Sequence, residues 1–143
     1  MSARSFFDSN LLVYTDDLDA PEKQDRVLSL WQEHRSRGRA VISIQVLQEY
    51  FWAATRKLGV DPGIATEKLM LFGRADVMTP RTDDVVSAAR LSIEHKLFFW
   101  DAMIVQMAIQ ADCAVLFSED MQAGRRFAGV EIVNPFLAGP GKH

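Results

Sequence analysis

Apolar residues follow two patterns along the 143-residue chain, short continuous runs and longer stretches in which they recur every three or four positions. Short runs bounded by polar or turn residues predict strands, and the longer periodic stretches predict helices. The predicted strands are residues 5–7, 40–44, 76–79, 114–117 and 130–133. The predicted helices are residues 10–14, 21–37, 45–57, 62–72, 83–95 and 100–111.

Glycine and proline mark where several of these helices begin and end. Pro21 suits a first helical turn, where its missing N–H leaves no hydrogen bond unmade, and Gly38 and Gly59 follow helices as glycine commonly does. The spacing also predicts which helical residues face inward. In the helix over 83–95 these are Val85, Val86, Ala89 and Ile93, and in the helix over 100–111 they are Ile104, Val105, Ala108 and Ile109.

Strands that alternate with helices of this length pair in parallel, because the chain must cross back over the sheet between them. The sequence therefore predicts an α/β fold, a three-layer α/β/α domain with a mainly parallel central sheet. No linker or internal repeat divides the chain, so we expect one domain over residues 1–138. Residues 139–143, which begin with Gly-Pro-Gly, are expected to form a flexible tail.

Composition and charge narrow the class of protein. Hydrophobic residues make up 48% of the chain and charged residues 24%, as in an ordinary globular domain. No apolar run approaches the roughly 20 residues that span a bilayer, and the first residues lack the apolar centre of a secretory signal, so we expect a cytoplasmic protein without membrane contact. The formal net charge of -3 gives no general attraction for nucleic acid, so any such contact must be local. The single cysteine, Cys113, has apolar neighbours and is expected in the core.

Four acidic residues fall where ligands bind in a parallel sheet, beyond the carboxyl ends of the strands. Asp8 directly follows the first predicted strand, and Asp120 follows the strand that ends near Ser118. Glu49 and Asp101 lie early in two helices expected to flank the same crevice. A hard divalent cation such as Mg²⁺ takes oxygen ligands and keeps several waters, so a few carboxylates suffice to hold it. We therefore predict a metal site formed by these four acids.

Each acid also has a purely structural interpretation. Aspartate is a favoured helix N-cap, which could explain Asp8 and Asp101. Asp120 could be a turn residue, and Glu49 could lie on the exposed side of its helix. Sequence context favours the metal site, because Asp101 in FFWDAMIVQMA and Glu49 near Trp52 have apolar neighbours. A carboxylate among apolar side chains needs a partner or an ion.

The order of these motifs resembles that of the PIN-domain family and, within it, of the VapC-type toxins of bacterial toxin–antitoxin pairs. FFDSNLLVY resembles the opening strand with its aspartate, Asp8, and ISIQVLQEYFWAATRK resembles the segment that carries Glu49. FFWDAMIVQMA resembles the third acidic motif at Asp101, and VLFSEDMQAG resembles the closing motif with Ser118 and Asp120. The closing motif often has threonine where this chain has Ser118, and both residues carry a hydroxyl.

This resemblance implies a PIN-like, metal-dependent endoribonuclease that cleaves RNA phosphodiester bonds. The catalytic and metal-binding set that it implies is Asp8, Glu49, Asp101 and Asp120. The cation would be Mg²⁺, with Mn²⁺ as an alternative, and Asp8 and Asp101 would be its direct ligands. Asn10 and Ser118 would orient a carboxylate or a water molecule. Glu119 would be either an additional acid or an exposed side chain.

The resemblance also implies partners. As a toxin, the chain would act on an RNA substrate, form a homodimer and bind a cognate antitoxin through an exposed apolar groove. The aromatic segments at 50–52 and 98–103 exceed what one small core needs and are candidates for this groove. Arg125 and Arg126 follow Asp120 by roughly one helical turn and are candidate contacts to RNA phosphates.

Two other classes of protein fit part of the sequence. An aspartate after a first strand is also typical of haloacid-dehalogenase-like phosphotransferases, but these usually need a second acid two positions on, where this chain has Asn10. A PIN-like module used only for binding would have no need of four clustered carboxylates. The chain has no G-x-S-x-G, P-loop or G-x-G-x-x-G motif, and its three histidines do not share the spacing of metal ligands.

Overall fold

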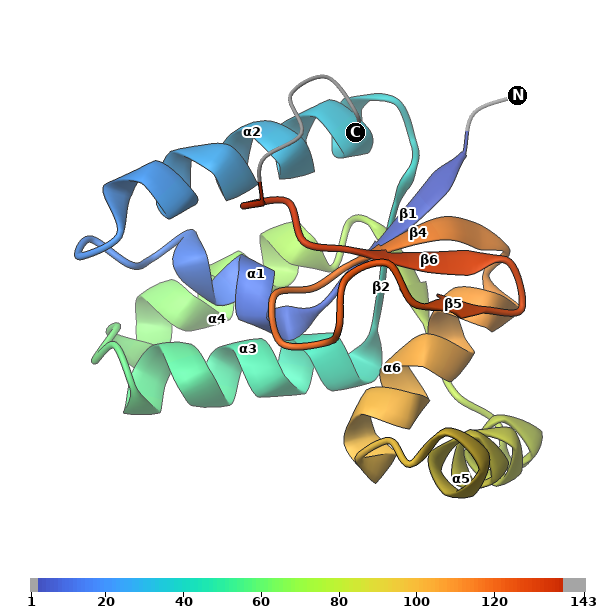
Figure 1. The fold of residues 1–143 in the computed structure, drawn as a ribbon. Helices are drawn as coiled ribbons and strands as arrows, with labels where there is room; N and C mark the ends of the chain where they lie inside the picture. The colour runs from blue at the N-terminus through green and yellow to red at the C-terminus, as the bar shows by residue number, and fades with distance from the viewer. Residues whose placement is uncertain (1–2, 138–143) are drawn as a thin grey trace.

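The computed structural model describes residues 3–137, so the tail expected at residues 139–143 lies outside the described residues (Figure 1). The strands are β1 (Arg4–Phe7), β2 (Ala40–Ser43), β3 (Asp76–Met78), β4 (Cys113–Phe117), β5 (Arg126–Phe127) and β6 (Val130–Val133). The helices are α1 (Ser9–Tyr14), α2 (Pro21–Ser36), α3 (Ile44–Arg56), α4 (Pro62–Phe72), α5 (Thr82–His95) and α6 (Phe99–Gln110).

The strands form one sheet in the order β3-β2-β1-β4-β6-β5. All neighbouring pairs are parallel except β5 with β6, which are antiparallel. The predicted α/β class with a mainly parallel sheet is therefore confirmed. The sequence pattern missed β5, because a strand of two residues carries too little periodicity to be recognised without its partner strand.

The direction in which the chain builds the sheet reverses once. The chain moves from β1 outward to β2 and β3, and it then returns to place β4 on the other side of β1. With right-handed crossovers, this reversal puts α1 to α4 on one face of the sheet and α5 with α6 on the other. Figure 1 shows α5 and α6 together at the lower right, apart from α1 to α4 at the left. The reversal leaves a crevice at the carboxyl ends of β1 and β4.

The core lies between the sheet and the helices on its two faces. Phe6 and Phe7 of β1 and Leu116 of β4 are fully or almost fully buried, and Cys113 is 4% exposed, as predicted. Helix α6 packs against β2, β4 and β6, and its residues from 102 to 108 are all buried. Within residues 3–137, no helix combines the length and the apolar character that a bilayer crossing requires.

The inward face predicted for α5 is wrong. Val85, Val86 and Ile93 are exposed, Ile93 by 81%, and the buried contact with α6 is made by Ala88. The reason is that α5 packs on α6 and makes little contact with the sheet, and a small side chain lets two helices approach closely. The periodicity identified an apolar stripe, but the structure leaves much of that stripe in contact with solvent.

Candidate active site

Asp8 stands at the junction of β1 and α1, where it is 5% exposed. It is the N-cap of α1, because its Oδ1 accepts a 2.7 Å hydrogen bond from the backbone N–H of Ser9. Its other oxygen, Oδ2, accepts a 2.8 Å hydrogen bond from the Ser118 hydroxyl at the end of β4. The capping interpretation of Asp8 is therefore correct, and one carboxylate both caps α1 and contacts the end of the neighbouring strand.

Asn10 joins the ends of β1 and β4. Its amide nitrogen Nδ2 lies 3.2 Å from Oδ2 of Asp8, 3.1 Å from Oδ2 of Asp120 and 3.3 Å from the Ser118 hydroxyl. Its amide oxygen accepts a 3.2 Å hydrogen bond from the backbone N–H of Glu119. Asn10 thus uses both ends of its amide to hold two predicted acids and the segment after β4 in one arrangement.

Glu49 reaches the same place from α3, and both of its oxygens are held. The Ser9 hydroxyl donates to Oε1 over 2.8 Å, and the Gln45 amide donates to Oε2 over 3.0 Å. Gln45 also donates to the backbone carbonyl of Trp100 over 3.0 Å, which ties α3 to the first turn of α6. Neither Ser9 nor Gln45 was predicted, although the spacing of four residues between Gln45 and Glu49 on one helix indicates contact.

Asp101 lies in the first turn of α6, but it does not cap the helix. The N-cap is Phe98, and no side chain caps α6 by a hydrogen bond, so the capping interpretation of Asp101 is wrong. Among residues 3–137, none donates a hydrogen bond to the half-buried Asp101 carboxylate. Asp120 is exposed and accepts only from Asn10 among these residues. Two of the four acids therefore keep most of their oxygen lone pairs free for another partner.

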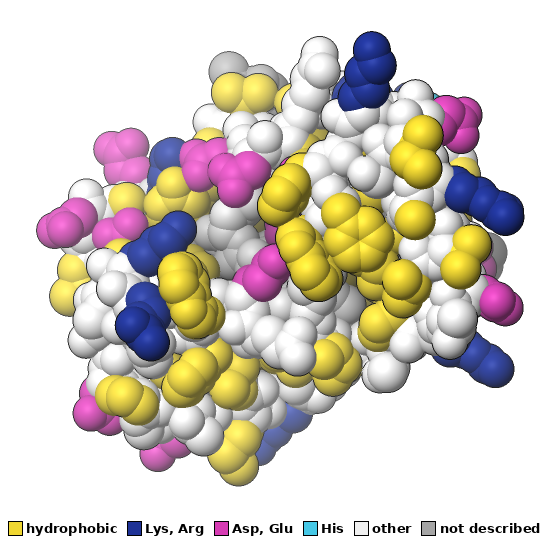
Figure 2. Space-filling model, turned by 90° about the horizontal axis from the view of Figure 1, so that it is seen from below, with side chains coloured by type: hydrophobic (Ala, Val, Ile, Leu, Met, Phe, Trp, Pro, Cys, Tyr) yellow, Lys and Arg dark blue, Asp and Glu magenta, His cyan; other side chains and the backbone are white. Residues whose placement is uncertain are grey.

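All four predicted acids line one cleft of about 750 Å³. Its walls come from α1, α3, the first turn of α6 and the segment that follows β4. Figure 2 shows acidic side chains in and around a hollow, with apolar side chains to either side. The structure thus brings together Asp8, Glu49, Asp101 and Asp120 from four separate parts of the chain.

Two of the four acids, Asp8 and Asp101, have raised pKa values. Burial raises the pKa of Asp8 from its ordinary 3.8 to about 7, against the lowering effect of hydrogen bonds from Ser118 and Ser9. The negative charges of Glu49 and Asp101 make a smaller contribution to this rise. The pKa of Asp101 is also raised, first by burial and then by the charges of Asp120 and Glu49. The cleft therefore concentrates negative charge that favours either protons or a cation.

The donor atoms fit a hard divalent cation. The side chains are carboxylates with hydroxyl and amide neighbours and no thiolate, which is the oxygen chemistry that Mg²⁺ prefers. In the part of the chain that the structure describes, no three acidic, histidine or cysteine side chains are arranged as a complete coordination set. Several carboxylate oxygens instead accept hydrogen bonds from Ser9, Asn10, Gln45 and Ser118. The free oxygens of Asp101 and Asp120 are the available ligands.

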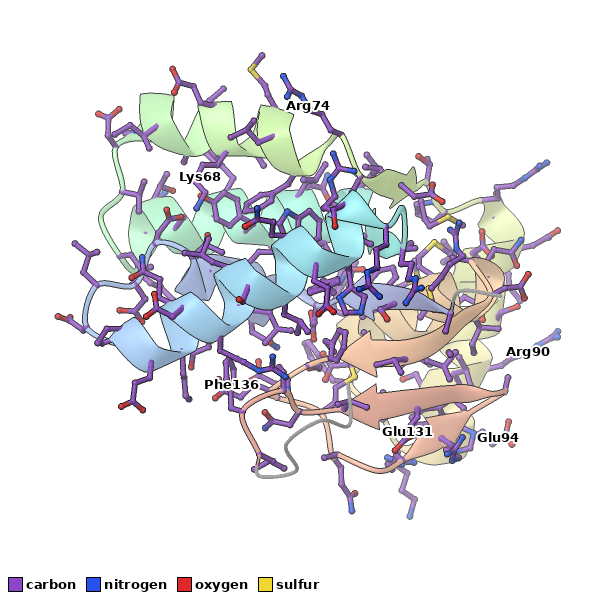
Figure 3. The ribbon with its side chains drawn as sticks, turned by 90° about the horizontal axis from the view of Figure 1, so that it is seen from above. Lys68, Arg74, Arg90, Glu94, Glu131 and Phe136 are labelled. Atoms are coloured by element: carbon purple, nitrogen blue, oxygen red, sulfur yellow. The ribbon has the colours of Figure 1, made fainter. Side chains whose placement is uncertain are left out.

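Glu119 is separated from the acidic set by its own partners. Its carboxylate forms an ion pair with Lys23 and accepts a 2.5 Å hydrogen bond from the Tyr14 hydroxyl. Burial tends to raise the pKa of Glu119, but the hydrogen bonds from Lys23 and Tyr14 outweigh it and lower the pKa. The ammonium of Lys23 also lies over the rings of Tyr14 and Phe136 (Figure 3 labels Phe136). Glu119 therefore holds the segment after β4 against α1 and α2.

The two arginines after Asp120 are placed differently from the prediction. No helix follows Asp120 among the residues described up to 137, so the expected spacing of one helical turn is wrong. Arg125 lies over the ring of Phe127 at 4.8 Å and lines a smaller hollow together with Asp101 and Asp120. Arg126 lies on the edge strand β5 and forms a 3.2 Å ion pair with Glu131. Of the two, Arg125 is the one beside the acidic cleft.

A model of the PIN-domain family matches residues 5–128, which include all four acids. The chain therefore belongs to the PIN-domain family. This membership excludes the haloacid-dehalogenase-like alternative. Asn10, which stands where that class usually has a second acid, donates hydrogen bonds to both Asp8 and Asp120.

Solved structures of toxins share the fold. VapC20 of Mycobacterium tuberculosis, described as a sarcin-ricin loop cleaving toxin, is 17% identical with a TM-score of 0.68, over 81% of this chain and 89% of that chain. A toxin–antitoxin complex from Klebsiella pneumoniae is 18% identical with a TM-score of 0.66, over 92% of this chain and 98% of that chain. DNA-bound VapBC from Salmonella typhimurium is 19% identical with a TM-score of 0.65, over 92% and 97%. No curated protein sequence matches the chain.

Proposed function

We propose that this protein is a divalent-metal-dependent endoribonuclease. The observation that carries the proposal is the convergence of four carboxylates, each from a different segment, at the point where the strand order reverses. Open parallel sheets bind their ligands at this point. Repulsion among clustered carboxylates destabilises the folded chain once they ionise, and it raises the pKa values of Asp8 and Asp101, so the cluster favours a functional role.

The residues of the cleft would have two kinds of role, metal binding and orientation of the metal ligands. Asp101, Asp120, Asp8 and Glu49 would hold Mg²⁺ or Mn²⁺. Such a cation, when bound, activates water and offsets the charge on a phosphodiester. Ser118 and Asn10 fix the orientation of the Asp8 carboxylate. Gln45 and Ser9 fix that of Glu49, so both carboxylates are oriented before any substrate arrives.

The charge of the cleft explains why a cation is needed for RNA to enter. Four carboxylates repel a phosphodiester, and the chain's net charge of -3 does not offset this. Arg125 beside the cleft, with Arg126 farther out on β5, supplies positive charge for flanking phosphates. RNA binding should therefore be tighter in magnesium than in chelator.

The test is cleavage of mixed cellular RNA by the purified protein, with magnesium and with chelator. We expect cleavage in magnesium that chelator stops and that manganese restores. Asp8→Asn should lose most of the activity while remaining folded, because asparagine also caps α1. An Asp8→Asn variant that cuts RNA at the parental rate would contradict the proposal, as would parental cleavage in chelator.

We further propose that the protein is the toxin of a toxin–antitoxin pair and forms a homodimer. The similarity in fold to VapC20, to the Klebsiella toxin–antitoxin complex and to VapBC supports this. An exposed apolar surface supports it as well, with Phe98 68% and Trp100 52% exposed beside the stripe of α5. Figure 2 shows apolar side chains gathered to the right of the hollow, over α5 and α6. Tyr50 and Met103, by contrast, are in the core.

The toxin proposal is tested in cells and in solution. Induced expression should stop bacterial growth, and Asp101→Asn should relieve the arrest. A small protein encoded beside the toxin gene should restore growth and co-purify with it. The dimer is tested by sedimentation of the purified chain at micromolar concentration. Phe98→Ser should then weaken both associations if the apolar surface over α5 and α6 is used.

A further inference from the structure

The cleft has two chemically different ends. One end carries the four acids. Beyond them, α3 and the turn after it contribute Trp52, Ala53, Lys57 and Leu58, and α1 with the turn after it contributes Tyr14 and Asp17. Figure 2 shows basic and apolar side chains together on the left of the hollow, the side toward which α3 runs in Figure 1. An acidic end beside an aromatic and basic end is the polarity expected of a site for a nucleotide chain rather than for a lone phosphate.

Helix geometry sets the order of groups along the cleft. Glu49, Ala53 and Lys57 are spaced by four residues and follow one stripe of α3 and its C-cap. With a rise of about 1.5 Å per residue, Lys57 lies about 12 Å beyond Glu49 along the helix axis. The small side chain of Ala53 leaves space in the cleft between Glu49 and Lys57, and Trp52 lines the cleft next to Ala53.

Trp52 and Lys57 are both free to bind. The Trp52 side chain is 57% exposed, and among residues 3–137 its indole contacts no other ring and donates no hydrogen bond. Trp31, by contrast, packs edge-on against Phe7 with ring centroids 5.0 Å apart. Lys57 is exposed and pairs with no carboxylate in the described part of the chain. Neither side chain contributes to the core, although both line the same cleft as the acids.

We propose that Trp52 and Lys57 form a nucleotide subsite, in which an unpaired base beside the cut stacks on Trp52 and its phosphate pairs with Lys57. This rests on the proposed nuclease function and names its substrate class. In a duplex, neighbouring bases cover each base face, so the subsite selects RNA that is single-stranded next to the scissile bond. Stacking on an indole accepts any base, so the subsite selects an unpaired strand and not a sequence.

The first test compares three substitutions of Trp52 on a single-stranded RNA and on a hairpin cut within its stem. Trp52→Ala and Trp52→Leu should raise KM for the single strand by about 10-fold, within the range for loss of one base–aromatic stack, and kcat should change far less. Trp52→Phe keeps an aromatic face and should stay near the parent. Binding of a labelled single-stranded oligoribonucleotide in chelator, followed by anisotropy, should give the same order of affinities.

The second test uses Lys57→Ala, with Arg74→Ala as its matched control. Arg74 is exposed on the surface after α4, away from the cleft (Figure 3). Lys57→Ala should reduce the slope of log affinity against log salt by about 1, as loss of one phosphate contact does. Arg74→Ala should leave the slope and the KM unchanged.

Three results would overturn the subsite. The first is an unchanged KM and an unchanged oligonucleotide affinity in Trp52→Ala. The second is an equal rise in KM on single-stranded and duplex substrates. The third is a Trp52→Ala variant that no longer binds a protein partner but keeps its affinity for RNA, which would assign Trp52 to protein docking instead. Failure of the nuclease proposal gives a different result, because the parent protein would then cut no RNA in magnesium. The anisotropy measurement would still show whether Trp52 binds a single strand.

Discussion

The hydroxyl of Ser118 donates a 2.8 Å hydrogen bond to Oδ2 of Asp8, a residue 110 positions earlier in the chain. The bond connects the carboxyl ends of β4 and β1, the two strands between which the sheet reverses its order. It also lowers the pKa of Asp8, against a burial that raises it to about 7. Ser118 therefore increases the ionised fraction of Asp8 near neutral pH.

Ser118→Ala should shift the pH dependence of RNA cleavage. Without the hydroxyl, the pKa of Asp8 rises further, since a hydrogen bond to a charged group contributes about 1.5–3 kcal/mol. The acidic limb of log kcat/KM should then move to higher pH by about one unit or more. Ser118→Thr keeps the hydroxyl and should leave the limb in place. A limb that stays fixed in Ser118→Ala would show that Asp8 does not control it.

Asp8 should make the metal-free protein less stable as the pH rises. Its folded pKa of about 7 exceeds its ordinary 3.8, so the folded state binds the proton more tightly. This contribution to stability is fully present below pH 3.8 and is lost as the pH rises through about 7. Relative to the parent in chelator, Asp8→Asn should gain up to roughly 4 kcal/mol of unfolding free energy over this window. Denaturant unfolding from pH 4 to pH 8 measures this difference, and a constant difference would refute it.

Asp101→Asn should separate the structural from the functional role of this acid. Removing one charge from the repelling cluster should leave the chelated protein melting no lower than the parent near neutral pH. Magnesium should stabilise the parent by binding its folded state and stabilise the variant much less. Cleavage in magnesium should be nearly abolished. The measurements are paired melts and cleavage assays, and a parental rate with a parental magnesium shift would remove Asp101 from the site.

Arg125 and Arg126 should contribute unequally to RNA binding. Arg125 shares a hollow with Asp101 and Asp120, while Arg126 pairs with Glu131 on the edge of the sheet. Arg125→Ala should weaken binding of every RNA tested and reduce the salt slope by about 1. Arg126→Ala should change little, and the double variant should match Arg125→Ala. Equal effects of the two single variants would mean that RNA also reaches β5.

The strands and helices were predictable where the pattern was local. The short apolar runs at β2 and β4 and the Pro21 helix start needed no knowledge of distant residues. The prediction for α5 failed because periodicity identifies an apolar face without identifying the element that covers it, and the contact with α6 is made by Ala88 and Leu91, which lie outside the predicted stripe. Strand β5 was not predicted because its two residues form a strand only by pairing with β6, and their own sequence does not indicate this pairing.

For the site, the sequence indicated which residues converge but not how they are held. The four acids could be placed at one crevice because each stood at a strand end or at the start of a helix. The bond from Gln45 to Glu49 lies within α3, where their spacing of four residues indicates it. The bond from Ser9 to Glu49, by contrast, depends on how α1 and α3 meet, and the pairing of Glu119 with Lys23 depends on how the segment after β4 meets α2. Single residues in a sequence carry no signal for such contacts, so only the fold could reveal them.

The position of β1 in the middle of the sheet has a consequence for synthesis of the protein. β1 pairs on one side with β4, which begins only at Cys113, so the crevice between the carboxyl ends of these two strands cannot form until β4 has been made. At about 5–20 residues per second, a ribosome needs on the order of ten seconds to reach β4. If the chain is a toxin, the cleft that holds its acids is completed only late in the synthesis of each copy.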